Sequence, residues 1–119
     1  MRFRGKIIPG KGIGRKLGFP TLNLKPPVES ENEAGVFAAR IFLGKKTFPA
    51  ILFLGNRQTF DNQRTLEVHI LEDFKEQPKS IEFEILDKIR EVVKFDSAEE
   101  LKAQIEKDCA RAREILGVR

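Results

Sequence analysis

Three kinds of residue are scarce in this chain: it has no Trp, no Tyr and a single cysteine, Cys109. One cysteine cannot form an internal disulfide, so the chain needs no oxidising compartment and we expect it in the cytoplasm. No apolar run approaches the ~20 residues that span a bilayer, and no signal-peptide pattern is present, so we expect no membrane association. The lack of Trp and Tyr also removes the best stacking surfaces for exposed bases, which disfavours nucleic acid as a partner.

Acidic residues are absent from the first 28 positions, which hold seven basic residues, whereas the remainder carries 15 basic and 18 acidic residues. A positive end on an otherwise acidic protein suits a polyanionic ligand, either a nucleoside triphosphate or a nucleic-acid backbone. Charge alone does not separate these two ligands. The length of 119 residues predicts a single domain, residues 1–119, that can bury a core without disulfides.

A glycine-rich basic segment follows the first expected strand. Four glycines within nine residues are costly in regular secondary structure, but they let the backbone approach a ligand closely. Basic side chains among them would converge with exposed amides on one anion, as in phosphate-binding loops. An ordinary hairpin turn is the alternative, and the pattern is neither a Walker loop nor a dinucleotide fingerprint. The glycines are Gly10, Gly12, Gly14 and Gly18, and the basic residues are Lys11, Arg15 and Lys16.

Pro20 ends this segment and restricts the residues around it. Its ring fixes its own φ and favours extended backbone at Phe19. On an extended segment Thr21 and Asn23 point the same way, because side chains two residues apart share a face. These two oxygen-bearing side chains are candidate ligands of a metal ion; the alternative is that both are satisfied locally as turn residues.

Alternation of apolar and polar residues predicts a series of strands joined by short polar links, as in an antiparallel barrel or sandwich. In the fifth strand, Glu67 and His69 share the face opposite to the apolar residues, and a solvated surface is the usual place for a strand Glu. The last segment changes to helical spacing, with Ser97 and Glu100 as a capping box and Gly117 as the stop. The expected strands are 3–9, 22–24, 36–43, 47–54, 65–71 and 80–86.

The string Gly-x-Gly-x-x-x-Gly-Phe-Pro-Thr-x-Asn, which ends at Asn23, resembles the nucleotide loop and Pro-Thr-x-Asn magnesium motif of the riboflavin kinase family. Residues 35–38 are similar to that family's Gly-Val-Tyr-Ala strand, and residues 66–71 are similar to the strand that carries its catalytic Glu. Residues 89–97 and several helix positions continue the likeness to about Arg113. The fold that the resemblance implies is a six-stranded antiparallel Greek-key barrel with a C-terminal α-helix.

The resemblance also implies an activity, the transfer of the γ-phosphoryl group of ATP to the 5′-hydroxyl of riboflavin, which gives FMN. Glu67 takes the catalytic position, and Thr21 and Asn23 take the Mg²⁺ positions. The implied flavin-binding residues are Phe95, Leu101, Gln104 and Arg113. The implied nucleotide-binding residues are Gly10, Lys11, Gly12, Gly14, Arg15, Gly18, Pro20 and Thr21.

Two segments depart from the family pattern. Phe53 and Gln58 stand where the family has Asn and Pro, and the connection 72–79 lacks the family's Tyr and Gly and is a few residues short. From the short connection 72–79 we expect a more open flavin pocket, with riboflavin binding completed only when nucleotide is present. The altered connection also favours one alternative, a flavin- or nucleotide-binding module without turnover.

A third reading is a basic-ended β-barrel that binds single-stranded nucleic acid. Either a free-standing kinase or an excised piece of a protein with an FAD-forming adenylyltransferase domain is compatible with the sequence.

Overall fold

A computed structural model describes residues 2–8, 21–25, 34–55 and 65–118. These residues form six strands and one helix, in the order expected from the alternation and the helical spacing. The predicted and observed bounds differ most at the sixth strand. The sequence predicts an end at residue 86, and the strand continues to Arg90. The elements are β1 (Arg2–Ile8), β2 (Thr21–Leu24), β3 (Gly35–Leu43), β4 (Lys46–Leu54), β5 (Leu66–Ile70), β6 (Ser80–Arg90) and α2 (Ala98–Leu116).

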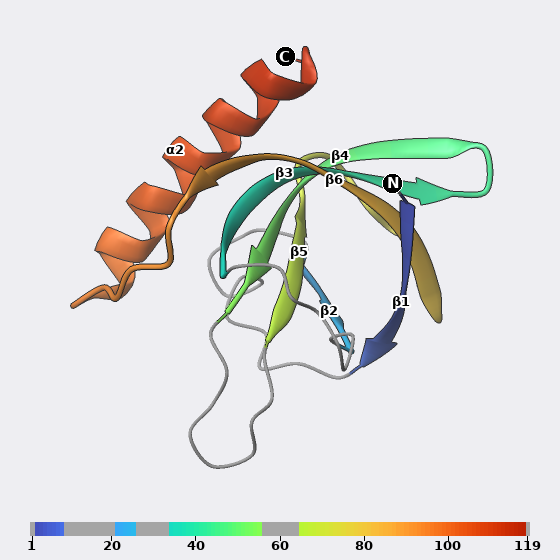
Figure 1. Cartoon of the computed structure of the whole chain (residues 1–119), viewed down its shortest axis with the longest axis horizontal. Coiled ribbons are helices and arrows are strands. Elements are labelled where there is room, and N and C mark those ends of the chain that lie inside the picture. The colour runs from blue at the N-terminus through green and yellow to red at the C-terminus, as the bar shows by residue number, and fades with distance from the viewer. Residues whose placement is uncertain (1, 9–20, 26–33, 56–64, 119) are drawn as a thin grey trace.

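The strands close into an antiparallel barrel in the order β1-β2-β5-β4-β3-β6 (Figure 1). β3 and β4 form the expected hairpin, whose turn residue Gly44 has a φ of 61°, a conformation that glycine adopts without strain. β2 pairs with β5 rather than with β3, which gives the Greek-key connection, and β1 closes the barrel against β6. The expected Greek-key barrel is therefore confirmed.

β6 is longer than expected because it pairs with β3 across a register shift. The polar residues Asp87 and Lys88 interrupt the alternation, which is why the sequence predicts an earlier end. Lys88 nevertheless lies opposite Phe37, and Arg90 lies opposite Val36, beyond bulges in the ladder. A bulge lets a strand bend while it stays paired, and β6 thereby delivers the chain to the start of the helix (Figure 1).

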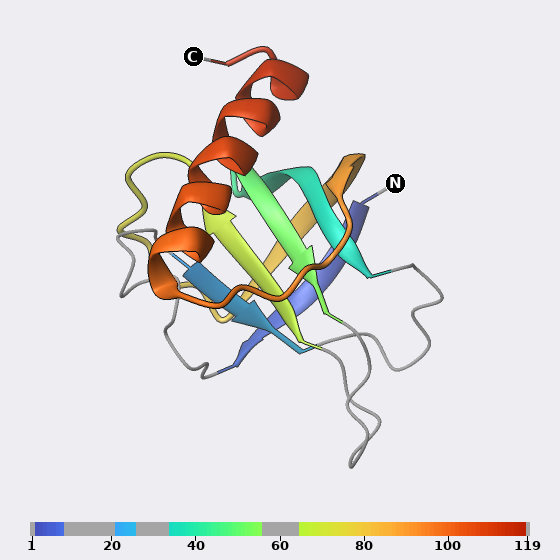
Figure 2. The same cartoon turned by 90° about the vertical axis from the view of Figure 1, so that its left-hand side faces the viewer.

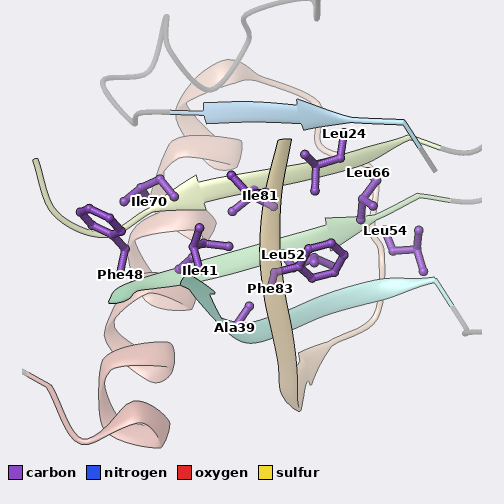
Figure 3. Packing of buried hydrophobic residues seen from close by; sticks show 12 residues of the cluster. Leu24, Ala39, Ile41, Phe48, Leu52, Leu54, Leu66, Ile70, Ile81 and Phe83 are labelled. Atoms are coloured by element: carbon purple, nitrogen blue, oxygen red, sulfur yellow. The ribbon is translucent and has the colours of Figure 1, made fainter. Parts of the chain in front are cut away.

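Apolar side chains pack together in the interior of the barrel (Figure 3). Alternate residues of each strand point inward, and Ile41, Leu52 and Val68 are fully buried there. At one end the connection 72–79 covers this core: the Phe74 ring lies edge-on to Phe48, with 5.0 Å between the ring centroids. An ion pair attaches the same connection to β4: Lys46 Nζ lies 2.9 Å from a carboxylate oxygen of Glu76.

Helix α2 lies across the outside of the barrel (Figure 2). The hydroxyl of Ser97 accepts a hydrogen bond from the Glu100 amide, and Gly117 ends the helix in the left-handed region at a φ of 69°, as the sequence predicts. The apolar stripe of the helix packs on outward-facing residues of β3 and β4. The members of this second cluster are Val36, Ala38, Ile51, Ile105, Cys109, Ala112 and Leu116.

Burial in this cluster raises the pKa of the Cys109 thiol to about 11. Cys109 is only 3% exposed. In the described ranges no helix has the length and apolar composition needed to cross a bilayer.

Candidate active site

The register between β2 and β5 brings four polar residues onto one outer face of the barrel. Residues opposite each other in an antiparallel pair share a face, and Asn23 lies opposite Glu67 while Thr21 lies opposite His69. Their neighbours in sequence, including Leu24, point inward to the core. The predicted metal ligands and the predicted catalytic Glu, which are far apart in the sequence, therefore stand side by side.

β4 extends this face on the far side of β5. Phe53 lies opposite Glu67, and Ile51 lies opposite His69. Asn23, Glu67 and Phe53 thus form one row across the three strands, and Thr21, His69 and Ile51 form the next. Each row has a polar residue on β2 and an apolar residue on β4. Glu67, on the central strand β5, lies between the polar residues of β2 and the apolar residues of β4.

Both titratable residues of this face are largely buried. The side chain of Glu67 is 23% exposed and that of His69 is 9% exposed, and 3.7 Å separates His69 Nε2 from Glu67 Oε2. That distance exceeds a hydrogen bond, which is about 2.7–3.2 Å. Glu67 is therefore not the solvated strand Glu of the alternative interpretation, because three-quarters of its side chain is covered by neighbours.

A cavity of about 280 Å³ opens between this face, helix α2 and the connection 91–97. Glu67 and His69 form part of its wall on the barrel side, together with Phe53. The opposite wall is mainly apolar and comes from the connection and the helix. Its apolar residues are Val93, Phe95, Leu101 and Ile105.

The far wall is held in place by a buried ion pair. Arg90, at the end of β6, donates from Nε and Nη2 to both carboxylate oxygens of Asp108 at 2.8–3.0 Å, and Asp108 is only 2% exposed. Gln104 donates to the same carboxylate at 3.0 Å, and the Arg90 guanidinium lies 5.6 Å from the centre of the Phe95 ring. A two-pronged pair of this kind fixes direction as well as distance, so it locks the helix, β6 and the connection together.

The four predicted flavin-binding residues are divided between different places. Phe95 and Leu101 line the cavity. Gln104 acts on the wall through Asp108. Arg113 lies elsewhere: its Nη2 donates to the backbone oxygen of Leu71 at 3.2 Å, and it lines a separate hollow of about 220 Å³ near the end of the helix.

The other predicted nucleotide residues, Gly10, Lys11, Gly12, Gly14, Arg15, Gly18 and Pro20, lie outside the described residues. Thr21, the last of the predicted set, is the first described residue after them and is 8% exposed. Within the described ranges no group of three or more His, Cys, Asp or Glu residues is placed to hold a metal. The candidate metal ligands are instead the neutral oxygens of Thr21 and Asn23, which suit Mg²⁺ when phosphates and water complete its shell.

Sequence reasoning gave no role to three residues of this site, His69, Phe53 and Arg90. The sequence did carry a signal for His69, which shares the face of Glu67 by strand alternation. Phe53 stood out as a departure from the family pattern. Nothing in the sequence indicated that Arg90 pairs with Asp108 on the helix.

Comparisons with known proteins identify the family and the fold. A family model for riboflavin kinase, or flavokinase, matches residues 1–116. The bifunctional riboflavin kinase/FMN adenylyltransferase of Escherichia coli (strain K12) is 36% identical over 117 residues, which cover 96% of this chain and 37% of that protein. This chain thus spans little more than a third of that relative.

Two solved structures resemble the fold. A crystal structure of a macrolide-efflux protein from Streptococcus pneumoniae matches with a TM-score of 0.83 at 29% identity and covers 94% of this chain and 38% of that one. Riboflavin kinase from Trypanosoma brucei matches with a TM-score of 0.67 at 21% identity, over 98% of this chain and 79% of that one, and shares the fold. On the strength of the family match along nearly its whole length, this chain belongs to the riboflavin kinase family.

Proposed function

We propose that this chain is a riboflavin kinase that transfers the γ-phosphoryl group of ATP to the 5′-hydroxyl of riboflavin, giving FMN. The observation that carries the proposal is the position of Glu67. It lies opposite Asn23 in the β2–β5 ladder and lines an apolar cavity. A carboxylate between candidate metal ligands and an apolar pocket is suited to accept a proton from a hydroxyl group held there.

The cavity favours a flat, largely apolar ring as the substrate's recognition element. Its volume of about 280 Å³ is close to the lower end of small-molecule pockets, about 300–1,000 Å³. Phe53, Phe95 and Leu101 supply apolar walls. We infer that the flavin ring occupies this space, with its ribityl chain directed past Glu67 toward β2.

In this proposal, β2 and the segment before it bind the phosphates of ATP and the metal ion. Thr21 and Asn23 would hold Mg²⁺, which when bound neutralises charge on the phosphates. Lys11 and Arg15 would contribute further positive charge, and the glycines around them would let backbone amides approach the phosphates. Transfer through a loose transition state needs mainly positioning and charge stabilisation, and these metal- and phosphate-binding groups would supply both.

Glu67 would orient the 5′-hydroxyl and accept its proton late in the transfer. The alternative, a flavin- or nucleotide-binding module without turnover, is favoured by Phe53, which places a ring beside Glu67 where the family has an amide. An adenylyltransferase domain, as named for the relative in Escherichia coli, would be the natural partner in a longer protein.

The test is to incubate the purified chain with riboflavin, ATP and Mg²⁺ and to separate flavins by chromatography. Formation of FMN by the wild type, and its loss in Glu67→Gln, would support a kinase. Glu82→Gln is the matched control, because Glu82 is also a strand Glu but is paired with Arg2 and Arg4 on β1, away from the cavity. Binding of riboflavin with no FMN formed would favour the module without turnover.

A further inference from the structure

We propose that His69 is a positioning residue, which holds the carboxylate of Glu67 in its working orientation. This inference rests on the proposed kinase function. His69 is the only histidine of the chain and the established family motifs quoted above assign it no role. It stands two residues beyond Glu67 on the same strand and the same face.

The geometry favours a directed contact. His69 Nε2 lies 3.7 Å from Glu67 Oε2, and the imidazole is 9% exposed and lines the same cavity as the carboxylate. The other ring nitrogen, Nδ1, is buried. Nε2 is thus the ring nitrogen that approaches Glu67.

The surroundings leave few other groups for this task. Phe53, directly opposite Glu67 on β4, has no N–H to donate. Arg90 lines the same cavity, but its guanidinium is committed to Asp108 and to the backbone oxygen of Glu91. Asn23, on the other side of Glu67, is a candidate metal ligand. Among the described residues of the cavity wall, His69 is thus the nitrogen donor best placed for the carboxylate.

The distance of 3.7 Å is looser than a hydrogen bond. Catalytic hydrogen bonds are often long in the unliganded state and shorten only in the substrate complex. A bound flavin ring would exclude water from the cavity, so that the carboxylate would take an N–H from His69 in exchange for water. Without that contact, Glu67 would retain more of its rotational freedom, and a misplacement of about 1 Å at a reacting group can cost about 10²-fold in rate.

Three substitutions separate this role from simple packing. In His69→Gln the amide nitrogen reaches roughly the position of Nε2, whereas in His69→Asn it mimics Nδ1 instead. His69→Phe keeps the bulk of the ring and removes both nitrogens. We expect kcat to fall by about 10²-fold in the Phe and Asn variants and to recover in the Gln variant, while the dissociation constants for riboflavin and an ATP analogue change far less than kcat.

A double-substitution cycle supplies the decisive readout. If His69 acts through Glu67, then His69→Phe should cost little further rate in a chain that already carries Glu67→Gln, because the two residues work as one unit. Additive losses, or equal losses in the Gln and Asn variants, would overturn the positioning role. Should the Phe variant fail to fold, as judged by its urea unfolding curve, the comparison of Gln with Asn decides alone. Absence of FMN from the wild type would instead overturn the proposed function.

Discussion

At the residue scale, Glu67 shows most clearly what the structure adds to the sequence. Strand alternation predicts that it faces away from Leu66 and Val68, but not whether that face is wet or covered. The structure shows a covered face, because the helix and the connection 91–97 form an outer wall over β4 and β5. The sequence could not predict this cover, since it depends on where a helix far along the chain docks.

Glu67→Gln keeps the shape of the side chain and removes its basicity. We expect riboflavin and ATP binding to be retained while kcat falls by about 10²–10⁴-fold, the usual contribution of a positioned base. Steady-state FMN formation and calorimetric titration of each substrate measure the two effects. FMN formation at the wild-type rate would show that Glu67 is only part of the cavity wall.

Thr21→Ala removes one of the two candidate oxygen ligands on β2. Because the Thr21 side chain stands in the row next to Glu67 and Asn23, we expect kcat to fall by about 10²-fold and the Mg²⁺ concentration for half-maximal rate to rise. Riboflavin affinity should change little. A magnesium dependence equal to that of the wild type would refute the assignment.

Phe53→Asn restores the amide that the family has at this position. We expect weaker riboflavin binding, by about 3–10-fold in dissociation constant, because an aromatic wall contributes about 0.5–1.5 kcal/mol beyond its buried area. Phe53→Leu is the control, since it keeps an apolar wall, and calorimetry measures both. Tighter riboflavin binding in the Asn variant would place the ring outside the flavin site.

At the element scale, the attachment of α2 to the barrel determines the shape of the cavity, because the helix forms part of its outer wall. The helix and its caps were predictable from local signals, Ser97 at the start and Gly117 at the end. The apolar stripe indicates that the helix packs on the sheet, but not the ion pair of Arg90 with Asp108 that holds it there, because a charged residue on a helix is ordinarily expected in solvent. The extension of β6 past residue 86 brings Arg90, its last residue, to this pair.

Asp108→Ala leaves the Arg90 guanidinium partly buried and without its bidentate partner. We expect a loss of about 3–5 kcal/mol in the free energy of unfolding, as when one member of a buried ion pair is removed. Arg111→Ala is the matched control on the same helix, because its pair with Glu114 is exposed and worth about 0–1 kcal/mol. Urea unfolding measures both, and equal losses would contradict the structural role of the pair.

Cys109 makes the helix interface sensitive to alkaline pH. Burial raises its pKa to about 11 from an ordinary value of 9.0. A group whose folded pKa is raised stabilises the fold fully below the unfolded value, so this contribution should be lost as pH rises from about 9 to about 11. Urea unfolding at several pH values should show a steeper decline for the wild type than for Cys109→Ala, and parallel curves would contradict the shift.

At the scale of the whole molecule, the strand order was predictable only through the family resemblance. Alternation located the strands, but pairing of β2 with β5 follows from barrel closure and not from any local signal. The glycine-rich segment 10–20, which the sequence marks most strongly, lies outside the described residues, so its role stays a prediction. The connection 72–79 caps the barrel through Phe74, and its effect on riboflavin affinity likewise stays a prediction.

Closure of the barrel has a consequence for when the protein can first work. Thr21 and Asn23 meet His69 and Glu67 only through the β2–β5 ladder, and β1 gains its second neighbour only when β6 has been made. Such distant pairings form late, since the entropy of closing the chain is lost before the contacts repay it. A growing chain on the ribosome can thus hold the β3–β4 hairpin and yet present no assembled site. We therefore expect the proposed kinase activity only after β6 and α2 have been synthesised, because residues of both line the cavity.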